Sequence, residues 1–177
     1  QLSEMRKTIH IPVVLMGYMN PILQYGFEAF CARAKEVGVD GLILPDLPLF
    51  EFENSYGKTI KDNGLDFIFL VTPETPEERL RKLDSLSSGF LYAVSSSATT
   101  GKDKDFSQVA LYLERLQQMN LKNPILVGFG IKDKQTFDAV NEFSNGAIIG
   151  SAYIKALAEG EEVGVTTKQF LNSVLGN

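Results

Sequence analysis

The residues with the clearest chemical potential are small ones that follow apolar runs late in the chain. Gly130 is the next-to-last residue of the segment 127–131, and Gly150 and Ser151 stand at the end of the next apolar run. A phosphate dianion is best held by several backbone N–H groups with a helix N-terminus behind them. Glycine is favoured at such turns because a side chain would obstruct the close approach. The pattern predicts a phosphate cradle in which Ser151 caps a short helix over 152–158 and donates its hydroxyl to the anion.

A third element of this candidate site is the small, polar segment 95–101, which follows another apolar run. Its composition suits a loop that folds over a ligand as a lid. A single glycine turn is commonly only a tight connection between a helix and a strand. It is the combination of two such turns on consecutive late runs with a Ser/Thr/Gly lid that favours phosphate binding.

Other kinds of catalytic site are poorly supported by the composition. His10 is the only histidine and Cys31 the only cysteine of the 177 residues, which disfavours a histidine-based metal site or a Ser-His-Asp triad. We therefore expect no metal. Cys31 falls in the apolar pattern of a helix, so we expect a buried structural thiol rather than a nucleophile.

The formal net charge of −5, dispersed along the chain, argues against a nucleic-acid surface. No apolar run approaches the roughly 18 residues that a membrane span requires, and the segment 1–10 has no signal-peptide core. We expect a cytoplasmic protein that binds neither nucleic acid nor membrane.

Apolar runs alternate with amphipathic stretches along the whole chain, as in a parallel α/β protein. We expect strands at 11–18, 41–47, 67–72, 90–95, 125–131 and 147–150. We expect helices at 26–37, 50–63, 76–87, 107–120, 133–143 and 166–175, with a short helical turn near 151–158. Gly38 and Gly64 are placed to end helices, Thr75 and Pro76 to begin one. Nothing divides the chain, so residues 1–177 are predicted to form a single domain.

The two common parallel folds differ in where phosphate binds. An open dinucleotide-binding sheet usually shows G-x-G-x-x-G after its first strand, and that motif is absent. A phosphate site after the last two strands is typical of a (β/α)8 barrel. The positions of Gly130, Gly150 and Ser151 favour the TIM barrel.

Several motifs in order along the chain resemble one family, the α subunit of tryptophan synthase. They are the segments 12–20, 37–41, 45–48, 92–101, 128–131 and 150–151. The resemblance implies a (β/α)8 barrel and the retro-aldol cleavage of indole-3-glycerol phosphate to indole and glyceraldehyde 3-phosphate. It implies no cofactor in this chain, because pyridoxal phosphate belongs to the β subunit that receives the indole in an α2β2 complex.

Carried over position by position, the resemblance implies roles for individual residues. Phosphate is expected on Gly101, Gly130, Gly150 and Ser151. The indole ring is expected against Tyr18, Ile43 and Phe129, although periodicity alone reads these three as barrel core. Tyr92 is expected near the reacting centre in a supporting catalytic role, and Thr100 is expected to organise the site when the lid closes. One departure is Ala98, where the family commonly has glycine.

The main catalytic carboxylates of the family, a glutamate and an aspartate, correspond to positions upstream of Gln1. A complete barrel needs about 250 residues, so roughly 70 to 90 are expected to be absent, leaving about six of the eight β/α units. The strands at 11–18 and 147–150 would then be unpaired edges. We expect this chain alone to be an inactive fragment.

Asp46 is the best acid within the chain to replace the missing pair, since it follows the end of a strand. In the family this position faces the β subunit, so the resemblance favours an interface role for Asp46 and for Asn20 in the preceding βα loop. Two alternatives stay open: another phosphate-binding barrel enzyme of amino-acid biosynthesis, and a noncatalytic regulatory partner of a β subunit.

Overall fold

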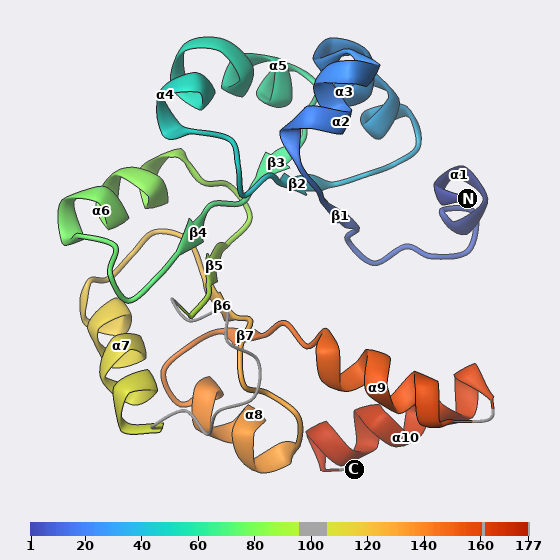
Figure 1. Ribbon diagram of the computed structural model, residues 1–177, viewed down its shortest axis with the longest axis vertical. Coiled ribbons are helices and arrows are strands. Elements are labelled where there is room, and N and C mark those ends of the chain that lie inside the picture. The colour runs from blue at the N-terminus through green and yellow to red at the C-terminus, as the bar shows by residue number, and fades with distance from the viewer. Residues whose placement is uncertain (96–105, 161, 177) are drawn as a thin grey trace. The chain divides into compact units, whose positions relative to one another are not determined.

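The computed structural model describes residues 1–95, 106–160 and 162–176 and divides the chain into two compact units (Figure 1). The first comprises Gln1–Leu70 and Leu83–Phe90, and the second comprises Val71–Lys82 and Leu91–Asn177. Each unit is described by itself. The prediction that the whole chain forms one domain stays a prediction.

The first unit contains a parallel sheet with the strand order β1-β2-β3. Its elements are α1 (Leu2–Met5), β1 (Val14–Met16), α2 (Met19–Tyr25), α3 (Phe27–Glu36), β2 (Gly41–Ile43), α4 (Leu49–Glu51), the π-helix η1 (Phe52–Tyr56), α5 (Gly57–Asp62) and β3 (Asp66–Phe67). All residues of the central strand β2 are buried, as expected for a parallel strand covered on both faces.

Two helices of this unit end where the sequence predicts. Gly38 and Gly64 have φ angles of +81° and +65°, a region that glycine enters without steric cost. After α3 the Val39 N–H donates to the Ala34 carbonyl, and after α5 the Leu65 N–H donates to the Ile60 carbonyl. These bonds are those of the Schellman motif, which satisfies carbonyls at a helix end.

The predicted helix over 50–63 is built from α4, η1 and α5 in succession. At its centre the Gly57 N–H bonds the Phe52 carbonyl in the i→i−5 pattern of a π-helix. A methyl group on Gly57 would lie 2.6 Å from that carbonyl oxygen. The Phe52 ring packs on Phe67 and Phe69, with ring centroids 4.7 Å and 4.9 Å away. The π-helix is thus part of the aromatic core of this unit.

Arg6 ties the beginning of the chain to the turn before β2. Its Nη1 donates to the Ile11 carbonyl at 2.6 Å, and its Nη2 lies 3.3 Å from the Asp40 carboxylate. The same carboxylate accepts the Val13 N–H at 2.7 Å. These bonds satisfy the backbone just before β1, which is one reason that the predicted strand over 11–18 shortens to Val14–Met16.

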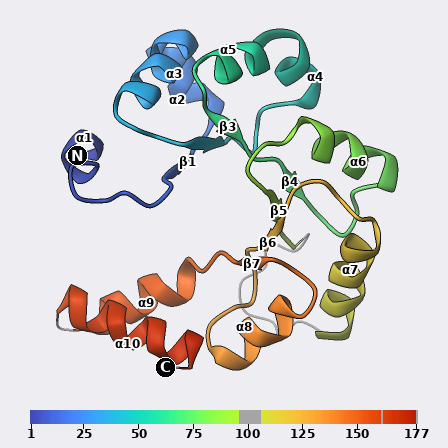
Figure 2. The same cartoon turned by 180° about the vertical axis from the view of Figure 1, so that it is seen from behind.

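The second unit contains a parallel sheet with the strand order β4-β5-β6-β7. Its elements are β4 (Leu70–Val71) and α6 (Glu77–Leu86), each of which has residues assigned to both units, β5 (Leu91–Ala93), α7 (Phe106–Gln118), β6 (Ile125–Val127), α8 (Lys134–Asn141), β7 (Gly146–Ala147), α9 (Ser151–Glu159) and α10 (Val163–Leu175). The helices α9 and α10 lie side by side in both views (Figures 1 and 2). Its core includes the wholly buried Leu80, Leu91 and Val127.

The predicted strand over 67–72 is two strands, β3 and β4, because its backbone changes partners. The Ile68 N–H donates to the carbonyl of Leu42 in β2, whereas the Val71 carbonyl accepts the N–H of Val94, which follows β5. Between β3 and β4 the Phe69 N–H donates a hydrogen bond to the Ser87 hydroxyl, at 3.4 Å. A side chain from the end of α6 therefore supplies the partner that a ladder would otherwise provide.

The sequence missed the helix α2. Asn20, expected in a loop, is its second residue, so the loop prediction was wrong. The N-terminus of α2 is satisfied from a distant part of the chain, since the Met19 N–H bonds both carboxylate oxygens of Asp46 at 3.0 Å. A cap from 27 residues downstream leaves no local sequence signal.

Candidate functional site

The predicted site residues of the second unit lie in β5 or follow the carboxyl ends of β6 and β7, three neighbouring parallel strands. Tyr92 lies in β5 opposite Leu126 of β6, and Val127 lies opposite Ala147 of β7. Gly128–Gly130 and Gly150–Ser151 therefore leave the sheet at the same edge, the edge where parallel α/β proteins bind ligands.

Tyr92 and Gly128 form the closest relationship at this edge. A methyl group on Gly128 would overlap the Tyr92 ring, with only 2.5 Å to its Cζ atom. The Gly128 N–H donates to the Ala93 carbonyl at 3.0 Å, which holds the backbone of Gly128 against β5. Tyr92 is half-buried, and burial raises the pKa of its phenol. The side chain is therefore a neutral hydroxyl that can donate or accept a hydrogen bond near neutral pH.

Both cradle glycines border space that the described residues leave open. Gly130 has a φ angle of +74°, so its backbone favours glycine for conformational reasons as well. Gly150 has an ordinary φ of −106°, and a methyl group there would meet no atom of the described residues within 4 Å. Nothing in the packing of the described residues requires glycine at Gly150, which leaves access to its backbone as the physical reason for a small residue. Phe129, between Gly128 and Gly130 in the first turn, is half-buried.

Ser151 does not cap α9 as predicted. Gly150 is the N-cap and Ser151 is the first helical residue, and no described side chain makes a hydrogen bond as the cap. The prediction placed the helix start one residue too late and its end one residue too early, because Glu159 still belongs to α9. The first intrahelical bond runs from the Ile154 N–H to the Gly150 carbonyl. The N–H groups of residues 151–153 therefore precede the helical hydrogen-bond pattern.

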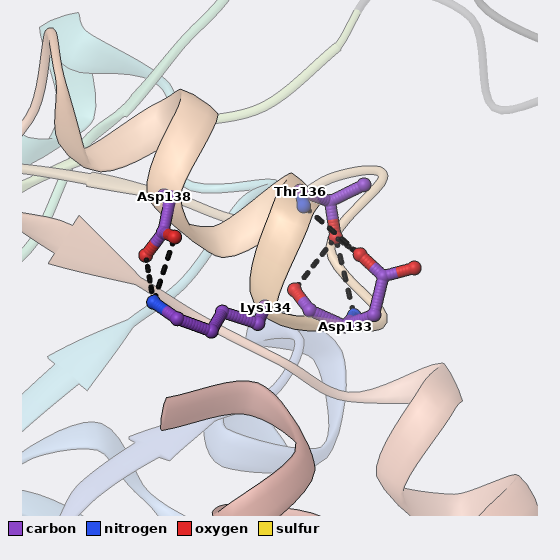
Figure 3. Close-up of polar contacts among 4 residues, drawn as sticks. All are labelled: Asp133, Lys134, Thr136 and Asp138. Atoms are coloured by element: carbon purple, nitrogen blue, oxygen red, sulfur yellow. Dashed lines mark hydrogen bonds and ion pairs between the residues drawn. The ribbon is translucent and has the colours of Figure 1, made fainter. Parts of the chain in front are cut away.

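The neighbouring helix α8 contrasts with α9 at its N-terminus (Figure 3). The Asp133 carboxylate accepts the Thr136 N–H at 2.9 Å, and the Thr136 hydroxyl accepts the Asp133 N–H at 3.2 Å. These bonds form a capping box. The Thr136 N–H and the Thr136 hydroxyl both donate to the Asp133 carboxylate and lower its pKa. Lys134 pairs with Asp138 one turn along. A helix end that already holds its own carboxylate is a poor anion site, whereas the N-terminus of α9 has no such occupant.

The remaining pocket and interface residues lie in the first unit, at the ends of β1 and β2. Ile43 is buried opposite Met16, and Tyr18, the N-cap of α2, is 65% exposed. Asn20 and Asp46 are exposed, and Asp46 holds the start of α2 through the Met19 amide. The structure thus brings Tyr18, Asn20 and Asp46 together around one helix terminus.

Several predictions concern parts of the chain that the structure does not describe or properties that it does not test. Ala98, Thr100 and Gly101 lie outside the described residues. Cys31 is buried, and burial raises the pKa of its thiol to about 11, as expected for a structural cysteine. Within residues 1–95, 106–160 and 162–176 no group of three or more His, Cys, Asp or Glu side chains is placed to hold a metal. No helix in the same ranges is long and apolar enough to cross a bilayer.

The sequence pointed to Gly130 but gave no role to Gly128, which the structure shows in contact with Tyr92. The Gly-x-Gly spacing was the available signal, because two glycines in one turn suggest two different backbone requirements. Which side chain Gly128 makes room for depends on the pairing of β5 with β6, and that pairing is not local in sequence.

Parallel strands, crossover helices and small residues at the carboxyl edge of β5, β6 and β7 define a parallel α/β protein. The chain matches the family described as Tryptophan synthase alpha chain over residues 1–175. It therefore belongs to the tryptophan synthase alpha chain family.

Individual relatives agree with this assignment. The chain is 49% identical over 160 residues to the tryptophan synthase alpha chain of Flavobacterium psychrophilum and 52% identical over 158 residues to that of Parabacteroides distasonis. These matches cover 90% and 89% of this chain, and the chain spans 63% and 62% of the length of these relatives.

Solved structures agree as well. The tryptophan synthase α subunit of Pyrococcus furiosus superposes with a TM-score of 0.87 at 34% identity, over 99% of this chain and 71% of that one. A chain of the tryptophan synthase complex of the same organism gives a TM-score of 0.85 at 33% identity. The predicted fold class, a (β/α)8 barrel, is confirmed by this likeness, whereas the presence of only about six of the eight units stays a prediction.

Proposed function

We propose that a protein containing this chain and the remainder of the family's length cleaves indole-3-glycerol phosphate to indole and glyceraldehyde 3-phosphate. The bond between indole C3 and the glycerol phosphate breaks, C3 takes up a proton, and the adjacent hydroxyl loses its proton as the aldehyde forms. The catalytic glutamate and aspartate lie in the remainder, so the chain alone turns over nothing. The observation that carries the proposal is the family match over residues 1–175.

In this proposal the described residues hold the substrate. The phosphate sits at Gly130, Gly150 and Ser151, supported by the open space at both glycines and the uncapped start of α9. Thr100 and Gly101 belong to the same site. The roles of Tyr18, Ile43 and Phe129 toward the indole ring are those that the resemblance implies, and the neutral Tyr92 hydroxyl, held beside Gly128, serves the reacting centre. Indole-3-glycerol phosphate is the substrate, and no metal or cofactor is required from this chain.

The proposed protein partner is a tryptophan synthase β subunit, which carries pyridoxal phosphate in an α2β2 complex in the cytoplasm. The exposed residues Asn20 and Asp46 form part of the contact. Support comes from the likeness to a chain of the Pyrococcus furiosus tryptophan synthase complex. The bond from Asp46 to the Met19 amide would keep this contact in one conformation.

A hybrid protein tests the activity. The chain is joined to the part of the Flavobacterium psychrophilum relative that lies outside the matched stretch, and indole release is measured without a β chain. We expect turnover from the hybrid and none from the 177-residue chain. A folded hybrid without turnover would contradict the proposed lyase, and indole from the unmodified chain would contradict its inactivity.

Two variants of the hybrid test the cradle. Gly150→Val places a side chain where phosphate would approach, whereas Ala158→Val adds comparable bulk at an exposed position in the last turn of the same helix. We expect KM to rise about tenfold or more for Gly150→Val, which corresponds to about 1.4 kcal/mol of lost binding. We expect little change for Ala158→Val. An equal KM in the two variants would place the phosphate elsewhere.

A further inference from the structure

The start of α9 supplies two residues of the proposed phosphate cradle, Gly150 and Ser151, yet the packing of α9 itself holds this turn weakly. None of the nine residues of α9, all of which the structure describes, is buried. Gly150 is the N-cap, and the first intrahelical hydrogen bond comes from the Ile154 N–H. The direction of the N–H groups of residues 151–153 therefore depends on the neighbour that fixes this turn.

Tyr153, in the first turn of α9, links that turn to α10. Its hydroxyl oxygen lies 2.8 Å from the Thr167 hydroxyl oxygen. The Thr167 hydroxyl donates its own proton to the Val163 carbonyl at 2.6 Å, so the Tyr153 hydroxyl is the donor between the two side chains. The Tyr153 ring also packs on the Phe170 ring, with centroids 5.3 Å apart. Tyr153 therefore joins α9 to α10 by a polar and an aromatic contact at once.

The helix α10 is itself held at both ends. At its N-terminus the Glu162 carboxylate accepts two backbone N–H groups. At the other end Gly176 packs on the side chain of Lys134, the first residue of α8, and a methyl group on Gly176 would lie 2.5 Å from the Lys134 Cδ atom. The helix α10 thus contacts both α9 and α8, and α8 follows the turn that contains Gly130. This makes α10 a fixed support for the helix that begins at the cradle.

We propose that Tyr153 is a positioning residue of the phosphate site, an inference that rests on the phosphate binding proposed above. Its hydrogen bond to Thr167 holds the first turn of α9 on α10, which directs the N–H groups of residues 151–153 at the anion. The attraction of a helix N-terminus for an anion falls off within one turn, so the placement of that turn decides its strength. Tyr153 acts through the backbone of its own turn rather than by touching the substrate.

Three variants separate this role from a purely structural one, in which only the ring contact with Phe170 matters. Tyr153→Phe retains the ring and deletes the hydroxyl, and Thr167→Val removes the accepting oxygen at nearly constant shape. Because both variants delete the same bond, their effects on phosphate binding should not add in the double variant. Ser173→Ala is the matched control, since it removes an α10 hydroxyl that bonds the Phe170 carbonyl of its own helix.

Phosphate binding tests the inference without catalysis. Inorganic phosphate is titrated into the 177-residue chain and into the hybrid, and the amide signals of residues 151–153 are followed by nuclear magnetic resonance. We expect Kd to rise about threefold to tenfold for Tyr153→Phe and for Thr167→Val, the effect of one lost hydrogen bond, and to stay unchanged for Ser173→Ala. In the hybrid, KM for indole-3-glycerol phosphate should rise by the same factor while kcat changes by less than about twofold.

The outcomes distinguish a failure of this inference from a failure of the proposed function. If phosphate shifts these amides with the same Kd in the wild type, in Tyr153→Phe and in Thr167→Val, the phosphate site stands and the positioning role is overturned. Additive effects in the double variant would overturn it as well, because the two side chains would then act separately. If phosphate shifts none of these amides in either wild-type protein, the phosphate site itself fails and the role of Tyr153 with it.

Discussion

The Tyr92 ring lies over Gly128, so closely that any side chain at Gly128 would occupy the same space. One residue comes from β5 and the other from the turn after β6, and the two strands are held in parallel register. The pairing of β5 with β6 therefore helps to fix the position of the Tyr92 hydroxyl.

The first prediction follows from this contact. Gly128→Ala should lower the free energy of unfolding by about 1–3 kcal/mol, because the added methyl group overpacks a filled space. In the Tyr92→Ala background the same change should cost much less, since the ring is gone. Urea unfolding of the wild type, of each single variant and of the double variant gives the coupling energy between the two residues. Additive effects of the two substitutions would contradict the contact.

The second prediction concerns the π-helix. Gly57→Ala should destabilise the chain by about 1–3 kcal/mol, because the methyl group would press on the Phe52 carbonyl and ring. Gly17→Ala is the matched control, since a methyl group there meets no atom within 4 Å in the part of the chain that the structure describes, and Gly17 has no positive φ. Thermal unfolding followed by circular dichroism compares the two. Equal losses would show that the π-helix does not depend on glycine.

The third prediction concerns the remote cap of α2. Asp46→Ala should cost about 0.5–2 kcal/mol, the usual price of losing an N-terminal cap, whereas Asp46→Asn retains an acceptor and should cost less. Hydrogen exchange at the Met19 amide should be faster in Asp46→Ala than in the wild type. An unchanged Met19 exchange rate would show that the bond to Asp46 is not maintained in solution.

The fourth prediction concerns acid. Hydrogen bonds from Thr136 lower the pKa of Asp133, and those from the Gly164 and Val165 N–H groups lower the pKa of Glu162. A depressed pKa in the folded state means that the stabilisation is complete above the unfolded values, about 3.9 for Asp and 4.3 for Glu, and is lost as the pH falls through the folded values.

Asp133→Asn with Glu162→Gln removes both titrations. The free energy of unfolding of this double variant should therefore decrease less than that of the wild type between about pH 5 and pH 3. Urea unfolding at several pH values measures both slopes. Identical slopes would mean that these two caps do not contribute to acid sensitivity.

The sequence predicted the order and type of most elements because their signals are local. Gly38 and Gly64 mark helix ends by their own conformational freedom, and the apolar runs mark buried strands. Features that depend on distant partners escaped prediction. Asp46 caps α2, Ser87 divides one predicted strand into two, and Gly128 makes room for Tyr92. The cradle was predictable in position but not in detail, since the start of α9 at Gly150 and Ser151 depends on its backbone conformation.

The bonds of Arg6 to the Ile11 carbonyl and the Asp40 carboxylate, here called the Arg6 clamp, also report local opening of the chain. The Arg6 side chain is only 19% exposed and binds the Ile11 carbonyl and Asp40. Trypsin must draw that side chain into its own specificity pocket before it can cut, so the clamp has to release first. The rate of tryptic cleavage after residue 6, compared between the wild type and Asp40→Asn, should therefore measure how often the first unit opens at β1. A faster cut in the variant is expected, and an equal rate would show that Asp40 does not restrain the arginine.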